Sequence, residues 1–236
     1  MVEFSISSRW YELLILALCS YLVGCFNFAM VISARKKKDI SKLGSGNPGT
    51  MNMVRELGVK MGVLTFVCDA LKGGVPTLIA YFIYRNSVFA GTNVLVSDLA
   101  RYIAGFSVIV GHIYPVTMKF TGGKGIASTF GLFWVGLSCD SAWFALAGLG
   151  LVLLLLLYLI FRQLGAMASL IGVSVFGSAQ ACVLVLKNAV IEWPTIAALI
   201  VIFLLVALTW FAHRKNLVRL LAGEEHKTVL RKKKSV

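Results

Sequence analysis

Long apolar segments separated by short polar ones recur along nearly the whole chain of 236 residues. A helix needs about 20 predominantly apolar residues to cross the hydrocarbon core of a bilayer, and several of these segments approach that length. We therefore predict an all-α integral membrane protein with about seven transmembrane helices. The predicted spans lie near residues 11–33, 58–84, 96–116, 125–139, 142–160, 164–186 and 194–212.

The fourth predicted span is short and begins in a glycine-rich segment, residues 122–128. Irregular backbone at membrane depth is tolerated only where it lines a polar cavity or is buried in protein, so this segment predicts broken or re-entrant backbone beside a cavity. The spans leave no room for a separate soluble domain. Residues 1–236 are predicted to form one polytopic domain, with a basic tail at 227–236.

The composition supports a membrane location. Hydrophobic residues make up 58% of the chain and the mean hydropathy is +0.85, more apolar surface than a soluble domain of this size can bury. A net charge of +13 would ordinarily indicate nucleic acid, but the basic residues lie beside apolar segments without interleaved aromatic residues. Anionic membrane lipid and topology explain the charge better, and we predict no nucleic-acid partner.

The distribution of lysine and arginine predicts the orientation. If the N-terminus is external, only Arg9, Arg85 and Lys187 lie in outer segments. Most of the 23 basic residues then lie in the cytoplasmic segments 34–60, 112–124, Arg162 and 213–236. Cytoplasmic loops are enriched in positive charge, so we predict an external N-terminus and a cytoplasmic C-terminus.

The segment from Lys42 to Gly58 has the composition of a phosphate-binding loop. Its glycines can adopt positive φ or let the backbone approach a ligand, so that N–H groups converge on an anion. They are Gly44, Gly46 and Gly49. Hydroxyl and amide groups come from Ser45, Asn47 and Thr50. Asn52 and Arg55 fall on one face of the helix that follows, whose N-terminus itself favours anions. We predict a phosphorylated substrate at a membrane surface.

Two further polar clusters lie on the same predicted side. Gly123 and Lys124 place a cation on bendable backbone, and His213 and Asn216 share one helical face. The third cluster also contains Arg214, Arg219 and Glu225. Any one of these basic residues alone is better explained by snorkelling toward lipid headgroups, and His213 alone by a satisfied interfacial position. Their convergence on one face is what favours a site.

Two pairs of opposite charges lie within predicted spans. Asp69 with Lys72, and Asp98 with Arg101, have i,i+3 spacing, so each pair can neutralise itself on one helix face. We interpret both pairs as structural support behind the site, with Asp69 or Lys72 also able to face the cavity.

Several familiar motifs fail in this context. The spacing Gly44-x-Gly46-x-x-Gly49 matches a dinucleotide fingerprint, but a membrane span precedes it where the fingerprint requires a strand. Lys124 is followed by glycine, which excludes a Walker loop. Neither His112 nor His213 has an aspartate five positions on, and no zinc helix, serine elbow or CxxC pair occurs. These failures weigh against metal, nucleotide and serine-hydrolase mechanisms.

Taken together, the three clusters resemble the bacterial acyl-phosphate:glycerol-3-phosphate acyltransferase (PlsY) family. The pattern S-G-N-x-G-x-x-N-x-x-R resembles residues 45–55, G-H-x-x-P…F-x-G-G-K-G resembles 111–125, and H-R-x-N-x-x-R-L-x-x-G-x-E resembles 213–225. The resemblance implies acyl transfer from acyl phosphate to the sn-1 hydroxyl of glycerol 3-phosphate, giving lysophosphatidic acid and phosphate, the first step of phospholipid synthesis. It implies seven spans in the bacterial cell membrane, a cytoplasm-facing site, no metal or cofactor, and a functional link to the enzyme that makes acyl phosphate.

The resemblance also implies a role for each cluster. The donor phosphate is expected at Ser45, Gly46, Asn47, Gly49, Thr50 and Asn52. Arg55 and Lys124 are expected at glycerol 3-phosphate and at the charge of the transition state, and His213 and Asn216 at the acceptor. The supporting residues are Gly123, Arg214 and Glu225. The hydroxyl proton has two candidate acceptors, His213 and a phosphate oxygen of the donor.

Two positions depart from the family pattern. Met51 stands where the family commonly has threonine, so Thr50 would have to supply that hydroxyl. Gly165 or Ala166 stands where a serine is often found, with Ser169 displaced. The alternative function is a transporter or flippase for a phosphate-bearing anionic solute or lipid. No inverted repeat is visible, and the polar residues lie on one face only, which weighs against it.

Overall fold

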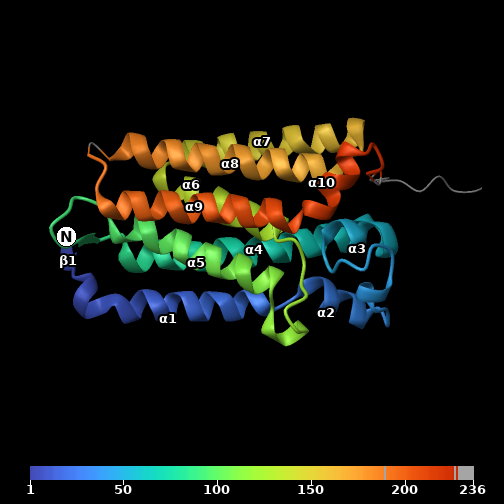
Figure 1. Cartoon of the computed structure of the whole chain (residues 1–236), viewed down its shortest axis with the longest axis horizontal. Coiled ribbons are helices and arrows are strands. Elements are labelled where there is room, and N and C mark those ends of the chain that lie inside the picture. The colour runs from blue at the N-terminus through green and yellow to red at the C-terminus, as the bar shows by residue number, and fades with distance from the viewer. Residues whose placement is uncertain (189, 226, 228–236) are drawn as a thin grey trace, which may run out of the picture.

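The computed structural model describes residues 1–188, 190–225 and 227. Its long helices lie along one common direction (Figure 1). They are α1 (Ile6–Cys25), α4 (Val59–Tyr84), α5 (Val96–Ile113), α6 (Ile126–Asp140), α7 (Ala142–Arg162), α8 (Gly165–Lys187) and α9 (Trp193–Ala212). The short elements α2 (Phe28–Arg35), η1 (Ile40–Lys42), α3 (Thr50–Leu57), η2 (Val116–Met118) and α10 (Arg214–Leu221) gather toward one end. We call this the α3 end and the opposite end the strand end.

Apart from two short strands, the described residues confirm a helical membrane architecture. Six helical segments are long and apolar enough to cross a membrane, judged by length and composition. The remaining apolar helix, α6, has 15 residues, so the count of seven stays a prediction. The predicted bounds lie close to the observed ones, as for 142–160 against Ala142–Arg162. The predicted basic tail at 227–236 lies, apart from Lys227, outside the described residues.

The first predicted span differs from the observed helices because the helix is interrupted at Phe26 and Asn27. The Asn27 side chain caps α2 by accepting a hydrogen bond from the Met30 N–H, at 3.0 Å. Lys72 Nζ donates to the Phe26 carbonyl at 2.7 Å and to the Gly24 carbonyl at 3.3 Å, which satisfies the end of α1. A buried lysine from α4 therefore fixes the point at which the first helix stops.

Two short parallel strands at the strand end were not predicted. Val2–Phe4 (β1) pairs with Ser87–Phe89 (β2). The Phe4 ring packs edge-on against Tyr84 and Phe89, at centroid distances of 5.8 and 5.7 Å. The pairing joins the first residues of the chain to the loop after α4, a contact between distant residues that local periodicity does not reveal.

Glycines allow the helices that carry the site to pack closely. A Cβ at Gly73 in α4 would collide with the Ser128 carbonyl of α6, and a Cβ at Gly131 in α6 would collide with the Ala70 carbonyl of α4. Small residues of this kind let helix backbones approach each other within a membrane. The start of α6, and the loop that precedes it, is thereby fixed against α4.

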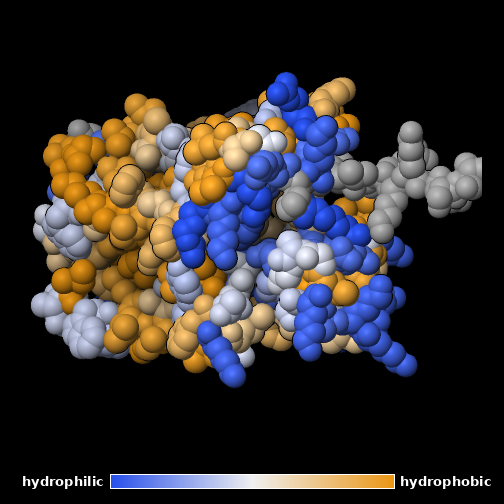
Figure 2. Space-filling view, turned by 45° about the vertical axis from the view of Figure 1, so that its right-hand side comes forward, coloured by the Kyte–Doolittle hydropathy of each residue, from blue (hydrophilic) through white to orange (hydrophobic). Residues whose placement is uncertain are grey.

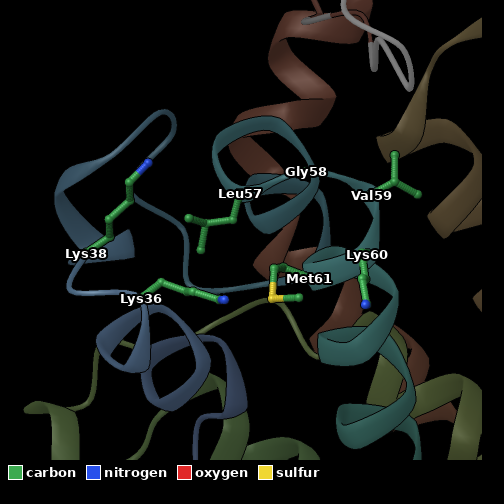
Figure 3. A pocket seen from close by; sticks show the side chains of 7 residues that line it. All are labelled: Lys36, Lys38, Leu57, Gly58, Val59, Lys60 and Met61. Carbon is green, nitrogen blue, oxygen red and sulfur yellow. The ribbon is translucent and has the colours of Figure 1, made fainter.

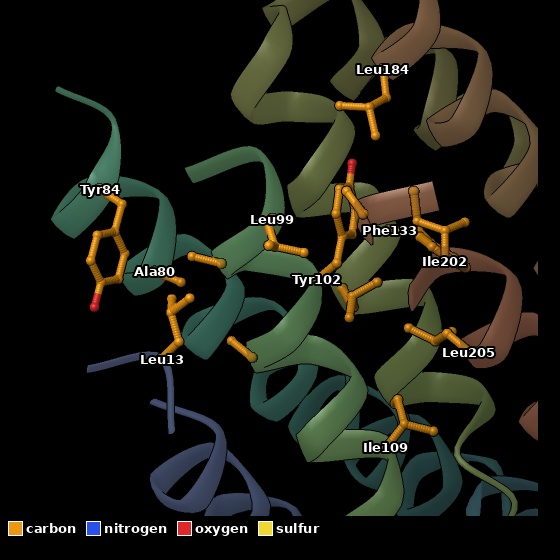
Figure 4. Close-up of a cluster of buried hydrophobic side chains, with 14 of the residues drawn as sticks. Leu13, Ala80, Tyr84, Leu99, Tyr102, Ile109, Phe133, Leu184, Ile202 and Leu205 are labelled. Atoms are coloured by element: carbon orange, nitrogen blue, oxygen red, sulfur yellow. The ribbon is translucent and has the colours of Figure 1, made fainter. Parts of the chain in front are cut away.

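The apolar core lies nearer the strand end, between α4, α5, α6, α8 and α9. Figure 4 shows its side chains, among them Leu99, Tyr102 and Phe133. A charged network adjoins this core. Arg101 bonds Asp98 at 3.3 Å and Asp140 at 2.8 Å. Lys187 Nζ lies 2.7 Å from Asp98 and 3.1 Å from Asp140. The predicted Asp98–Arg101 pair is thus confirmed as half of a network that joins α5, α6 and α8.

Candidate active site

The three polar clusters meet at the α3 end in one cavity of about 480 Å³. Figure 2 shows hydrophilic residues gathered at this end, while apolar residues cover most of the rest of that face. The predicted site residues that line the cavity are Ser45, Asn47, Gly49, Thr50, Asn52, Arg55, Lys124, His213, Asn216 and Glu225. Arg219 lines it too. Residues that are far apart along the sequence are therefore brought to one site.

Three predicted residues do not line this cavity. Gly46 has φ +68°, and its N–H donates to the Leu43 carbonyl at 3.0 Å. Gly123 packs against the ring of His112. Arg214 is exposed, lies 4.4 Å above the Phe211 ring, and donates to the Phe211 carbonyl at 3.1 Å. Arg214 therefore has the snorkelling arrangement that we considered for isolated basic residues.

Asn52 organises the loop of the first cluster. Its side chain is buried, with Oδ1 accepting from the Ser45 N–H at 3.1 Å. Nδ2 donates to the Ile40 and Leu43 carbonyls at 3.2 and 2.9 Å. A Cβ at Gly44 would collide with Asn52 Oδ1, and the positive φ of Gly44, +56°, also favours glycine there. The amide that we predicted at the donor phosphate is occupied within the loop.

The predicted nest of backbone N–H groups is also largely occupied. The Ser45, Gly46 and Gly49 N–H groups bond within the loop, to Asn52, Leu43 and Asn47. In this structure the loop satisfies these donors itself, so they do not converge on the cavity as a nest. α3 offers the alternative. Gly49 caps this helix without any side-chain acceptor, so the N–H groups of its first turn lack a partner from the cap. A helix N-terminus of this kind favours an anion.

Lys124 belongs to a chain of polar contacts across the cavity. Its Nζ donates to Asn216 Oδ1, and Asn216 Nδ2 donates to Glu225 Oε1 at 2.7 Å. The other Glu225 oxygen accepts from Arg219 Nε at 3.1 Å. Burial lowers the pKa of Lys124 to about 8. The Glu225 charge raises this pKa, whereas the charges of Arg219 and Arg55 lower it further. Lys124 is thus a cation that can lose its proton close to neutral pH.

Arg55 is the second cation of the cavity. It lies in the last turn of α3, and no carboxylate of the described residues lies within 4.0 Å of its guanidinium. A planar guanidinium without a carboxylate partner is suited to bidentate contact with a phosphate.

His213 is buried between α9 and α10. Its Nδ1 lies 2.9 Å from the Thr209 carbonyl oxygen, which only accepts, so Nδ1 carries the proton and Nε2 is an acceptor. Burial lowers the pKa of His213 to about 4, and the Lys124 charge acts in the same direction. The imidazole is therefore neutral at physiological pH.

The backbone that carries Lys124 rests on the end of α5. The Gly122 and Gly123 N–H groups donate to the Ile113 and His112 carbonyls at 3.0 and 3.1 Å. A Cβ at Gly123 would collide with the His112 ring. The broken backbone predicted for 122–128 ends at Gly125, because α6 begins at Ile126. His112 lines the cavity as well, and we predicted no role for it from the sequence although it lies in the second motif.

The cavity continues from its polar end into an apolar part. Lining residues come from α4, α6, α7 and α8: Val59, Val63, Phe66, Ile126, Phe130, Val152, Leu155, Leu156, Leu159, Ala166 and Ala168. The departures Met51 and Gly165 line it too, as does Ser169. Asp69 is also part of the wall, with Lys72 Nζ 3.2 Å from its Oδ1, which confirms that predicted pair. A cationic mouth and an apolar interior fit an amphiphile with an anionic head.

A second, shallower hollow of about 520 Å³ lies beside α3 (Figure 3). Lys36, Lys38 and Lys60 surround an apolar floor that includes Leu57 and Met61. This hollow adds positive charge near the mouth of the cavity. Among the described residues, no group of three or more His, Cys, Asp or Glu side chains is arranged to hold a metal ion.

Comparison with known proteins gives consistent results. A family model described as glycerol-3-phosphate acyltransferase matches residues 14–223. A protein of Mycoplasmopsis pulmonis with that description is 31% identical to this chain, over 89% of this chain and 91% of the relative. One of Thermoanaerobacter pseudethanolicus is 34% identical, over 89% of this chain and 93% of the relative. The crystal structure of PlsY (YgiH), an integral membrane glycerol 3-phosphate acyltransferase, in its glycerol 3-phosphate form has a TM-score of 0.71 and 29% identity, covering 92% of this chain and 95% of that one. The crystal structure of PlsY (YgiH) in its lysophosphatidic acid form has a TM-score of 0.70 and 28% identity, covering 93% of this chain and 96% of that one.

Proposed function

Because the chain belongs to the glycerol-3-phosphate acyltransferase family, PlsY type, we propose that it transfers a fatty acyl group from acyl phosphate to the sn-1 hydroxyl of glycerol 3-phosphate. It is an integral membrane glycerol-3-phosphate acyltransferase; the acyl-phosphate donor, the sn-1 position and the residue roles are the proposal. The hydroxyl oxygen bonds to the acyl carbon, the bond from that carbon to the donor phosphate oxygen breaks, and lysophosphatidic acid and phosphate result.

The observation that carries the proposal is the junction of a cationic mouth with an apolar interior in one cavity. Acyl phosphate has this character, since its head is a phosphate and its tail is a hydrocarbon chain. It is also a mixed anhydride with a good leaving group, so orientation and charge neutralisation supply most of what catalysis needs. A strong protein nucleophile is not required.

The donor phosphate is proposed to bind at the N-terminus of α3. The first-turn N–H groups of α3 supply donors, and Ser45, Asn47 and Thr50 line the same wall. Gly46, Gly49 and Asn52 shape this loop from within instead of donating to the phosphate. Thr50 is the hydroxyl nearest in sequence to Met51, where the family pattern has threonine.

The acceptor is proposed to bind between Arg55 and Lys124. Arg55 contacts the phosphate of glycerol 3-phosphate, and Lys124 neutralises charge that develops in the transition state. Asn216 holds Lys124 in place, and Glu225 orients Asn216. The hydroxyl proton goes to one of two acceptors, Nε2 of neutral His213 or a phosphate oxygen of the donor. Replacement of His213 by glutamine distinguishes these two proton acceptors, because transfer to the phosphate oxygen does not need the imidazole and activity is then retained.

The membrane arrangement is proposed from the charges. α6 serves as a short seventh span, the N-terminus is external, and the α3 end with its lysines faces the cytoplasm of a bacterial cell. That side gives access to soluble glycerol 3-phosphate and to the enzyme that makes acyl phosphate. One polytopic domain without metal or cofactor suffices for this chemistry.

The experiment is phosphate release by the detergent-purified protein given palmitoyl phosphate, with and without glycerol 3-phosphate, together with lipid analysis. We expect phosphate release that depends on the acceptor and equals the lysophosphatidic acid formed. Turnover with an acyl thioester but none with palmitoyl phosphate would overturn the donor assignment. An ester at the sn-2 position would overturn the regiochemistry.

A further inference from the structure

The apolar part of the cavity reaches a limited depth in the bundle. Going inward from the α3 end, the last lining residue is Phe130 on α6, Val152 on α7 and Ser169 on α8. α7 returns antiparallel to α6 after a connection at Ser141, and Phe130 and Val152 are equally far from it in sequence, so these two residues lie at comparable depth. Ser169 lies close to the start of α8 at Gly165, and therefore nearer the mouth. From Leu159 to Val152, α7 lines roughly 10 Å of the cavity at about 1.5 Å per residue.

Aromatic side chains fill the space behind this level. The Phe130 ring lies 5.6 Å from the Phe176 ring, centroid to centroid. A Cβ at Gly172 of α8 would lie 2.5 Å from Cζ of Phe130, so the ring reaches across to the backbone of α8. One turn further along α6, Trp134 Nε1 donates to the Ala145 carbonyl of α7 at 2.9 Å. Phe130 is therefore the surface of a packed layer between three helices.

The α4 side offers no alternative path for hydrocarbon. Its deepest lining residue is Asp69, whose carboxylate pairs with Lys72, and both side chains are buried. Methylene groups pressed against a buried ion pair would exclude whatever water still solvates it, which is unfavourable. The apolar residues that can accommodate a chain end belong to α6, α7 and α8.

We propose that Phe130 is the end wall of the acyl site and sets the upper limit of acyl-chain length, with Ser169 on the α8 wall between Phe130 and the mouth. This inference rests on the proposed function, because the ligand is the fatty chain of the acyl donor. Phe130 touches the far end of that chain and not the reacting atoms, so it determines specificity without taking part in catalysis.

Two substitutions change the wall in opposite directions. Phe130→Ala deepens the cavity, and Ser169→Leu shortens it. With acyl phosphates of graded length in mixed micelles, we expect Phe130→Ala to raise the rate ratio of long to short donors by about tenfold, the scale at which a pocket discriminates one methylene. Ser169→Leu should lower the same ratio. Leu154→Ala is the matched control on α7, because Leu154 is 64% exposed and does not line the cavity.

The ratio of the rates with two donors, measured on one preparation, does not depend on how much of the protein is folded. A destabilised variant therefore still gives a valid chain-length preference. Unchanged profiles in both variants would overturn the inference and show that the chain leaves the cavity sideways into the bilayer. A wild type that rejects every acyl phosphate would refute the proposed donor instead. The same length series, supplied as acyl thioesters, would then test the wall.

Discussion

At the scale of single residues, the site depends on how a few polar groups are already paired. The sequence patterns identified Lys124, Asn216 and Glu225 separately, and the structure links them by hydrogen bonds. Asn52 is the contrary case. Its type and position suggested a phosphate ligand, whereas its amide holds the loop together. A side chain's partners are set by tertiary contacts, which a single sequence does not contain.

Lys124→Ala should reduce acyl transfer by about two to three orders of magnitude, the usual cost of removing one group that stabilises developing charge. The variant should still purify as a folded protein, because Lys124 lies in a loop and not in the helix core. Lys119→Ala is the control, since Lys119 lies in the same loop but is exposed and does not line the cavity. Equal turnover of the two variants would remove Lys124 from the mechanism.

The rate should fall as pH rises through about 8, because Lys124 with a pKa of about 8 loses its positive charge there. Glu225 raises that pKa, so Glu225→Gln should move the falling limb of the pH profile to lower pH. Glu224→Gln, a change at the exposed neighbouring residue, should leave the limb in place. If the rate falls at the same pH in the wild type and in both variants, a group other than Lys124 controls the fall.

At the scale of elements, apolar runs predicted the helices well because each span must satisfy its own backbone hydrogen bonds. The features that were missed depend on distant partners. The interruption at Asn27 is completed by Lys72, and the two strands pair the first residues of the chain with Ser87–Phe89. Close packing of α4 and α6 likewise depends on which glycines face each other.

Gly131→Ala should destabilise the protein by about 1 to 3 kcal/mol, because the added Cβ would collide with the Ala70 carbonyl and push α6 away from α4. Thermal unfolding in detergent, followed by circular dichroism, measures this effect. Gly150→Ala is a matched change, since a Cβ there meets no atom within 4 Å. If the two variants unfold at the same temperature, the close α4–α6 contact is not a source of stability.

At the scale of the whole molecule, the two ends have different tasks. The α3 end gathers the cavity and the basic residues, and the strand end carries a charged network that joins α5, α6 and α8. The one-sided arrangement of polar clusters was foreseen from charge counting, and the Asp98–Arg101 pair from its spacing. Asp140 and Lys187 were not foreseen as partners. Asp140 is 39 positions from Arg101 and Lys187 is 89 positions from Asp98, and local sequence spacing does not reveal contacts over such separations.

Arg101→Leu should cost about 3 to 5 kcal/mol of stability, because it leaves Asp98 and Asp140 buried next to each other with only Lys187 to compensate. Lys187→Ala should cost less, since the Lys187 side chain is 30% exposed and water can replace it. Unfolding temperatures of the two variants in the same detergent give the comparison. A larger loss for Lys187→Ala would contradict the assignment of Arg101 as the centre of the network.

The contact between Asn216 and Glu225 has a consequence for biogenesis. The segments that are made early in synthesis, α1 through α5, already include the glycine-rich loop before α3 and the α5 end that supports Lys124. The group that orients Asn216 is made only when residue 225 leaves the ribosome. A partly inserted chain therefore lacks the Lys124–Asn216–Glu225 contacts, and the cavity is complete only after α10 and residue 225 have been made.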